Sequence, residues 1–176
     1  KLRSEWGQRP VWIAASTHGG EDEQVLAAHR QVLESQPDAL LILVPRHPER
    51  FNDVARLVQG AGFSMVRRST GDTPMRAEQV LLGDSMGELM MFYACADVAF
   101  VGGSLIAHGG HNYLEPAALG LPIVSGPPSF NFAEISQLLE GAGALQRVQD
   151  QSALALAVCE LLREPTAARQ AGATGL

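Results

Sequence analysis

The sequence predicts a doubly wound α/β fold with a mostly parallel sheet, and three observations support this prediction. Short apolar runs of strand length recur along the whole chain. Segments with helical spacing of their apolar residues separate these runs, and glycines and polar residues follow several of them. Alternation of this kind implies helices on both faces of the sheet and a ligand site beyond the carboxyl ends of the strands.

Length and composition narrow the class of protein. The 176 residues correspond to about one domain, and 46% hydrophobic residues are enough for a substantial core. A formal net charge of −6, without any run of like charge, argues against a nucleic-acid surface and against a charged tail. Cys95 and Cys159 lie far apart in apolar segments, which favours buried free thiols in a reducing compartment. No signal peptide or membrane span is recognisable, and because the chain starts at Lys1 we expect it to be the inner part of a longer protein.

The first half of the chain contains four predicted strands. They are the apolar runs over residues 11–15, 38–44, 63–66 and 79–82. Two predicted helices carry apolar residues at helical spacing, namely Val25, Leu26, Val32 and Leu33 in the first and Phe51, Val54, Leu57 and Val58 in the second. Gly60 and Gly62 end the second helix, and residues 71–74 form a turn before the fourth strand.

The second half continues the alternation. A helix over residues 89–94 leads to a strand over 98–101, which stops at Gly102 and Gly103, where only backbone can line the space beyond. Further strands are expected over residues 122–124 and 144–148, and further helices over 113–119, 132–139 and 151–162. Residues 166–176 are small and weakly patterned.

A loop rich in glycine precedes the short helix over residues 113–119. Asn112 is a good N-cap, and free amides at such a helix start favour an anion such as phosphate. Glu115 lies three residues later on the same face, where its carboxylate can accept two hydrogen bonds from a ribose diol. The alternative is an N-cap followed by a solvated or capping glutamate. Pro116 and the many glycines favour the ligand interpretation.

The loops after the first two strands offer further ligand groups. Ser16, Thr17 and His18 provide hydroxyls and an imidazole suited to phosphate or sugar oxygens, although an N-cap turn explains Ser16 and Thr17 about as well. Arg46 follows the second strand in a rigid turn, where its permanently charged fork is a good phosphate ligand. His47 is a weaker candidate, because it can simply hydrogen-bond the loop backbone.

The loop after the fourth strand runs over residues 83–88. It combines a capping residue, a glycine that permits close backbone approach and the apolar Met86, which together could hold a flat base through main-chain hydrogen bonds. The alternative is a capping box between Ser85 and Glu88. His108 and His111 lack a cysteine or acidic partner in sequence, so we predict no metal site. No nucleophile elbow or lysine-containing phosphate loop is present, which weighs against hydrolases and kinases.

Three motifs in order resemble the C-terminal lobe of the bacterial 3-deoxy-D-manno-octulosonic acid (Kdo) transferases. They are Pro45-Arg46-His47, Gly-Asp-Ser-Met-Gly-Glu-Leu over residues 83–89, and Gly-Gly-Ser-Leu over 102–105 followed by Gly-Gly-His-Asn-Tyr-Leu-Glu-Pro over 109–116. The resemblance spans nearly the whole chain. It implies a Rossmann-like domain, the C-terminal lobe of a two-lobed GT-B glycosyltransferase. Residues 1–176 would be the CMP-Kdo binding domain, and the N-terminal acceptor domain would be absent from this chain.

The resemblance also implies which residues contact CMP. They are Pro45, Arg46, Met86, Gly87, Glu88, Asn112, Tyr113, Leu114 and Glu115. Additional candidates from the same loops are Ser16, Thr17, His18, His47, Gly103, Ser104 and Gly110. The catalytic base and the membrane-associating segment would belong to the absent N-terminal lobe, so this chain alone is expected to be inactive. No metal or cofactor is required if Arg46 and the helix start at Asn112 stabilise the leaving phosphate.

The implied reaction is inverting transfer of Kdo from CMP-Kdo to a lipid A precursor, a step of lipopolysaccharide biosynthesis at the cytoplasmic face of the bacterial inner membrane. A base would deprotonate a sugar hydroxyl of the lipid, which attacks the anomeric carbon as CMP departs. The expected partners are CMP-Kdo and, through the absent lobe, the lipid A precursor, with no nucleic acid and no membrane contact through this domain. Three alternatives remain open: a UDP-sugar transferase lobe, a sugar-nucleotide epimerase lobe, and a non-catalytic nucleotide-binding module. The chemistry of these residues alone does not separate cytosine from uracil.

Overall fold

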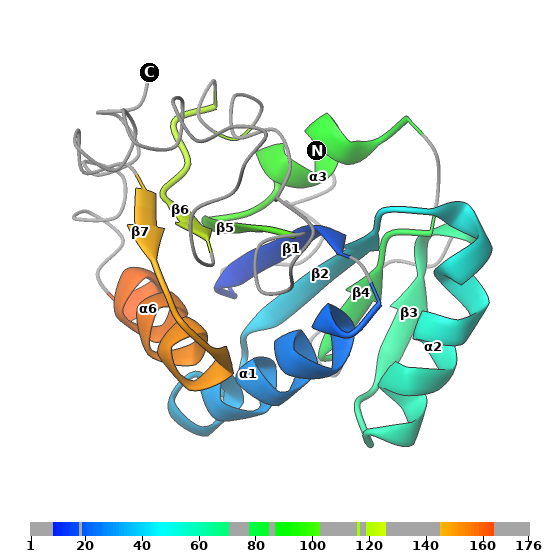
Figure 1. The fold of residues 1–176 in the computed structure, drawn as a ribbon, viewed down its shortest axis with the longest axis horizontal. Helices are drawn as coiled ribbons and strands as arrows, with labels where there is room; N and C mark the ends of the chain where they lie inside the picture. Colours follow the sequence, from blue (N-terminus) through cyan, green and yellow to red (C-terminus); the bar gives the residue numbers. More distant parts are fainter. Residues whose placement is uncertain are drawn as a thin grey trace.

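The computed structural model describes residues 9–17, 19–70, 78–84, 87–102, 116, 119–125 and 145–163. Within these residues the strands form one seven-stranded sheet in the order β3-β4-β2-β1-β5-β6-β7 (Figure 1). Every paired neighbour is parallel, which confirms the predicted sheet. The strands are β1 Val11–Thr17, β2 Leu40–Pro45, β3 Met65–Arg67, β4 Val80–Leu82, β5 Val98–Val101, β6 Ile123–Ser125 and β7 Leu145–Arg147.

The described helices are α1 Glu21–Ser35, α2 Phe51–Gly60, α3 Leu89–Ala94 and α6 Gln151–Arg163, with short 3₁₀ turns η2 Pro48–Arg50 and η3 Arg68–Thr70. All four helices lie where the sequence predicted helices, α1 and α2 from their apolar spacing, and α3 has the predicted bounds. The predicted helix over residues 132–139, most of that over 113–119 and the turn over 71–74 lie outside the described residues.

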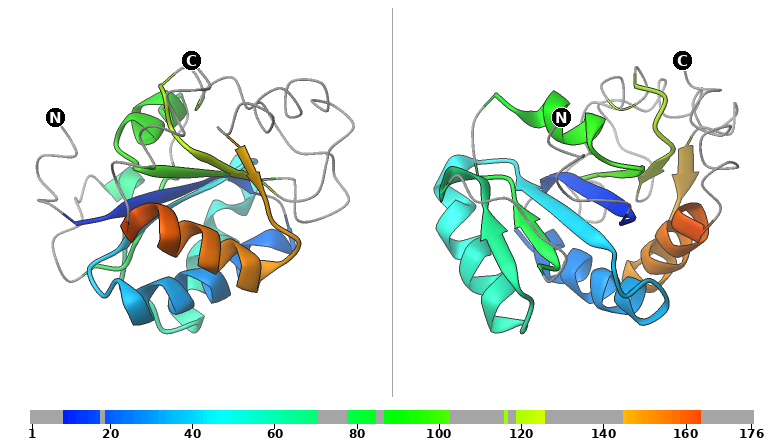
Figure 2. Two further views of the ribbon diagram at one scale, coloured as in Figure 1. Left: turned by 90° about the vertical axis from the view of Figure 1, so that its left-hand side faces the viewer. Right: turned by 180° about the vertical axis from the view of Figure 1, so that it is seen from behind.

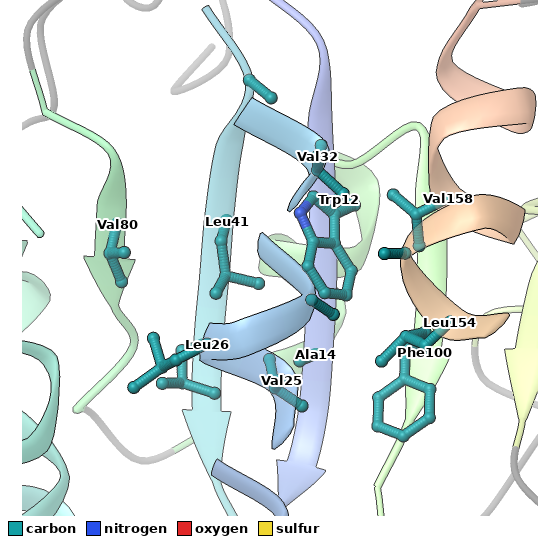
Figure 3. Close-up of a cluster of buried hydrophobic side chains, with 14 of the residues drawn as sticks. Trp12, Ala14, Val25, Leu26, Val32, Leu41, Val80, Phe100, Leu154 and Val158 are labelled. Carbon is teal, nitrogen blue, oxygen red and sulfur yellow. The ribbon is translucent and has the colours of Figure 1, made fainter. Parts of the chain in front are cut away.

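Helices cover both faces of the sheet (Figure 2). Side chains alternate along β1, so Trp12 and Ala14 join an apolar cluster with buried apolar residues of α1, α2 and α6. Figure 3 shows the part of this cluster that lies against α1 and α6. Val11, Ile13 and Ala15 face the opposite cluster, to which α3 contributes buried aromatic side chains. β2, β4 and β5 are buried throughout, and β1 is buried at every residue except Ser16, as expected for a parallel sheet covered on both sides.

Buried polar groups tie the amino edge of the sheet together. The Arg9 guanidinium donates to the carbonyls of Asp38 at 2.8 Å and Glu78 at 2.7 Å, which lie just before β2 and β4. In the same region the buried His29 of α1 links Trp12 to the carbonyl of Gln79. These bonds cross-link the strand starts on one edge, and the opposite edge carries the predicted ligand loops.

The two cysteines are buried free thiols, as the sequence predicted. Among the described helices, none combines the length and apolarity that crossing a membrane requires.

Candidate functional site at the carboxyl edge of the sheet

The loops of the predicted site leave four adjacent strands, β4, β2, β1 and β5. Backbone hydrogen bonds connect these loops where the strands end. The amide of Gly83 donates to Leu43 O at 2.8 Å, that of Arg46 to Thr17 O at 2.9 Å, and that of Gly102 to Ala15 O at 2.6 Å. Because all four strands are parallel, their loops begin side by side at one edge, where doubly wound folds bind ligands.

The end of β1 has an unusual backbone. Ser16 has a φ of 60° at an irregularity between Ala15 and Thr17, a conformation uncommon for residues other than glycine. Gly102 of the adjacent loop lies against this bend, since a Cβ there would come within 2.5 Å of Ser16 O and 2.6 Å of Ala15 O. Only glycine fits that approach, so Gly102 is required for the close packing of this loop against β1. The sequence had assigned the glycine to ligand space beyond β5, and that assignment stays a prediction.

A closed ring of hydrogen bonds holds the loop after β1. The hydroxyl of the buried Thr17 donates to Asp22 Oδ1 at 2.6 Å, and Arg50 donates both to Thr17 O, at 3.1 Å, and to Asp22 Oδ2. Asp22 lies in the first turn of α1 and Arg50 ends η2, so the ring joins three segments. Sequence reasoning missed both residues, because they are 28 positions apart and neither belongs to a motif.

The N-cap interpretation of Ser16 and Thr17 is wrong. α1 begins at Glu21, and its N-cap is Gly20, with a φ of 90° and no side-chain capping bond. The Thr17 hydroxyl donates to a carboxylate and does not accept a hydrogen bond from a helix amide. A threonine in this position therefore fixes the loop rather than the helix start.

Arg46 is presented to solvent by a buried strand. Pro45 is the buried last residue of β2, whereas Arg46 and His47 are exposed. The amide of Arg46 is fixed by Thr17 O, but no side-chain hydrogen bond or ion pair joins Arg46 to the other described residues. His47 is extended, and its carbonyl accepts from the amide of Arg50 at 3.0 Å. The backbone of this turn is held while the guanidinium projects at the carboxyl edge.

The side chain of Asp84 anchors the loop after β4 by hydrogen bonds to Arg67 and Ser69. This buried carboxylate accepts from the amide of Ser69 at 2.8 Å, from its hydroxyl at 2.6 Å and from Arg67 Nε at 2.6 Å. Gly83 before it has no room for a Cβ, which would meet Phe92 and Val44 at 2.9 Å each. Both residues therefore have structural roles, and they place the following loop residues relative to β3 and α3.

Gly87 and Glu88 complete this loop at the start of α3. Gly87 has a φ of 78°, which favours glycine although a Cβ would meet no atom within 4 Å. Glu88 is the N-cap of α3, and its carboxylate pairs with Arg68. The capping-box interpretation required Glu88 inside the first helical turn, so it is wrong for this residue.

The remaining predicted contacts lie outside the described residues: His18, Met86, Gly103, Ser104, Gly110, Asn112, Tyr113, Leu114 and Glu115. His108 and His111 lie outside them too. Within the described ranges, no group of three or more histidine, cysteine, aspartate or glutamate side chains is arranged to hold a metal ion.

A groove of about 990 Å³ lies between α1 and α2, away from these loops. Leu26, Leu57 and Phe63 form its apolar part, and none of the predicted ligand residues lines it. Arg30 also lines the groove, and its guanidinium lies over the Phe63 ring, 4.5 Å from the centroid. The loop geometry and the exposed cation therefore make the carboxyl edge, not the groove, the candidate site.

Comparisons with known proteins agree with the resemblance of the motifs. The family "Glycosyl transferases group 1" matches residues 8–175. The chain is 52% identical over 176 residues to a 3-deoxy-D-manno-octulosonic acid transferase of Haemophilus influenzae, covering 99% of this chain and 41% of that protein. A transferase of the same name from Bordetella pertussis is 43% identical over 170 residues, with coverages of 93% and 39%. The chain thus spans about two fifths of the length of these relatives.

One solved structure matches nearly the whole of this chain. It is the C-terminal CMP-Kdo binding domain of WaaA from Acinetobacter baumannii, with a TM-score of 0.94, 41% identity, and coverage of 99% of this chain and 92% of that one. The expected Rossmann-like domain of GT-B type is thereby confirmed. The chain belongs to the group 1 glycosyl transferases and, within them, to the Kdo transferases, whose C-terminal lobe it matches.

Proposed function

We propose that this chain is the donor-binding lobe of an inverting glycosyltransferase that moves Kdo from CMP-Kdo to a lipid A precursor. One comparison carries the proposal: the chain is 41% identical to a solved domain named for binding CMP-Kdo, and it covers 92% of that domain. The acceptor site and the catalytic base would belong to an N-terminal lobe, in the part of the relatives that this chain does not span. By itself the chain is then expected to bind the donor without catalysing transfer.

Arg46 is the proposed ligand of the CMP phosphate. Its guanidinium is exposed at the carboxyl end of β2, and its backbone is fixed by Thr17 O. A charge-assisted hydrogen bond from this position would stabilise the negative charge that develops on phosphate as CMP leaves. The backbone amides at Asn112 would stabilise the same negative charge on the phosphate. The carboxylate of Glu115 would accept hydrogen bonds from the ribose hydroxyls.

The loop after β4 is the proposed binding site of the cytosine base. Both carboxylate oxygens of Glu88 accept from Arg68, so we assign recognition to the main chain near Gly87 and Glu88. Main-chain donors and acceptors can match the edge of a base, and Met86 would supply apolar contact to its face. Pro45, Tyr113 and Leu114 would line the remainder of the CMP site.

The proposed reaction needs no group beyond those of the two lobes. A base of the N-terminal lobe removes the proton of a lipid hydroxyl, the oxygen attacks the anomeric carbon of Kdo, and CMP leaves with the bonding electron pair. With this reaction the full-length protein would act in lipopolysaccharide biosynthesis at the cytoplasmic face of the inner membrane. The acceptor lobe, rather than this domain, would contact the membrane.

Calorimetric titration with CMP, UMP, UDP and NAD tests the proposal. CMP should bind weakly but measurably, and more tightly than the other three ligands. Amide resonances that shift on adding CMP should cluster at residues 86–88 and 112–115. Preference for UMP or UDP would favour the UDP-sugar transferase or epimerase alternative, and binding of none would favour a non-catalytic module.

A further inference from the structure

Thr17, Asp22 and Arg50 form a buried polar ring beside the proposed phosphate ligand. Asp22 is fully buried, and each of its two carboxylate oxygens accepts one ring bond. Arg50 spans two acceptors with its fork, one on the Asp22 carboxylate and one on the Thr17 carbonyl. A buried carboxylate is costly unless it is satisfied in this way, so the ring is a strongly specified arrangement.

The ring meets Arg46 at a single atom. Thr17 O accepts both the Arg50 Nη1 hydrogen, at 3.1 Å, and the Arg46 amide hydrogen, at 2.9 Å. The position of this carbonyl therefore determines where the backbone of Arg46 lies. The residue before Thr17 is Ser16, which has the strained φ of 60° and contacts the loop after β5 through its carbonyl at Gly102.

We propose that Arg50, through its fork on Asp22 and the Thr17 carbonyl, is a positioning residue that aims Arg46 at the phosphate of the donor nucleotide. The inference rests on the proposed function. It gives Thr17 an indirect role, since its hydroxyl is committed to Asp22 at 2.6 Å and the residue is fully buried. Arg50 keeps its own charge engaged with Asp22, so it acts on the site through geometry and not as a second phosphate ligand.

Arg50→Lys is the sharpest test, because lysine keeps the charge but cannot bridge the two acceptors as the arginine fork does. CMP affinity should fall about tenfold, an effect within the range of coupled neighbouring residues. The matched control is Arg56→Lys, which changes an arginine that also pairs with an aspartate, Asp53, but in an exposed pair of α2. This control should bind CMP as the unmodified chain does, and thermal unfolding should show that both variants are folded.

A double-mutant cycle with Arg46→Ala separates positioning from general damage. If Arg50 acts through Arg46, Arg50→Lys should change CMP affinity by less than about twofold once Arg46 is absent. The same tenfold loss in both backgrounds would overturn the inference, and so would an unchanged affinity of Arg50→Lys alone. If Arg46→Ala weakens binding while Arg50→Lys does not, the proposed function stands and only the positioning role falls. Absence of CMP binding by the unmodified chain would reject both.

A second pair of variants covers the case in which Arg50→Lys unfolds the chain. Thr17→Val removes the hydroxyl that bonds Asp22, whereas Thr17→Ser retains it. The valine variant should lose CMP affinity and the serine variant should recover it, and the loss should again disappear in the Arg46→Ala background. Equal affinities of the valine variant and the unmodified chain would overturn the positioning role.

Discussion

Arg68 holds the carboxylate of Glu88 with two parallel hydrogen bonds, Nε to Oε1 at 3.1 Å and Nη2 to Oε2 at 3.0 Å. The pair connects η3, which follows the edge strand β3, to the N-cap of α3. Both side chains are partly exposed, at 27% and 29%, so the pair contributes only about 0.5 to 1 kcal/mol to stability. Its greater effect is on the orientation of the loop that we assign to the nucleotide base.

Glu88→Gln tests that assignment. The amide turns a donor toward Arg68, which breaks the two-bond pair, and we expect CMP affinity to fall by about three- to tenfold. Arg68→Gln should reduce affinity by a similar factor if the pair acts by orienting the loop, but not if the Glu88 carboxylate binds the nucleotide directly. Calorimetry measures both variants, with the exposed Glu160→Gln of α6 as control. Unchanged affinity in Glu88→Gln would remove this loop from the site.

Gly102→Ala should be strongly destabilising. The added Cβ would lie 2.5 Å from Ser16 O, and because the obstacle is backbone it cannot turn aside as a side chain could. We expect a loss of about 2 to 3 kcal/mol in the free energy of unfolding. Gly60→Ala is the control, since no atom lies within 4 Å of a Cβ there and helix residues tolerate alanine. Urea unfolding that gives equal stabilities for the two variants would contradict the close approach of β1 and the β5 loop.

Arg46→Ala should weaken CMP binding by about 1.5 to 3 kcal/mol, the range for a hydrogen bond to a charged group. The melting temperature should hardly change, because the side chain is exposed and has no bond to the other described residues. Arg163→Ala removes the same charge from the exposed end of α6 and should leave the affinity unchanged. A large fall in melting temperature without ligand would give Arg46 a structural role instead.

The fold was predictable because burial in a parallel sheet leaves a local signal. The central strands β1, β2, β4 and β5 are apolar runs, and β5 has the predicted bounds, residues 98–101. The α2 spacing predicted its buried Val54 and Val58. The alternation also predicted parallel pairing, since each crossover between strands needs a helix of suitable length.

The polar interactions within the fold were not predictable in the same way. Arg50 and Asp22 are 28 positions apart, and Arg9 reaches the carbonyl of Glu78 across 69 positions, so periodicity contains no information on either pair. The local capping rules failed at Thr17 because α1 begins only at Glu21, and the Thr17 hydroxyl bonds Asp22 in its first turn. They failed at Glu88 because this residue is itself the N-cap and its carboxylate pairs with Arg68, 20 positions away. Arg46, in contrast, could be named from the sequence as an exposed candidate ligand, because a charged residue directly after a buried strand is a local signal.

His29 is a buried histidine whose two ring nitrogens both have partners. The indole of Trp12 can only donate, so His29 Nδ1 accepts from it at 3.0 Å, and Nε2 donates to Gln79 O at 2.9 Å. The ring is therefore neutral in the folded chain. Burial lowers the pKa of His29 to about 4, the positive charges of Arg9 and Arg30 act in the same direction, and the bond to Gln79 opposes them.

A pKa of about 4 in the folded chain, against an ordinary value of 6.5, makes stability depend on pH. Between these values the unfolded chain binds a proton that the folded chain does not, so the free energy of unfolding falls as the pH decreases. The contribution of neutral His29 is complete above about pH 6.5 and is lost progressively down to about pH 4, amounting to at most about 3 kcal/mol.

His29→Gln isolates this contribution, because a glutamine amide can accept from Trp12 and donate to Gln79 O but does not titrate in this range. We expect the unmodified chain to lose stability relative to the variant as the pH is lowered from 7 to 4.5, measured by urea unfolding at each pH. Val32→Ala in the same helix is the control: it removes buried apolar volume, so its stability should follow a curve parallel to that of the unmodified chain. If the His29→Gln curve is parallel as well, protonation of His29 does not drive the acid loss of stability.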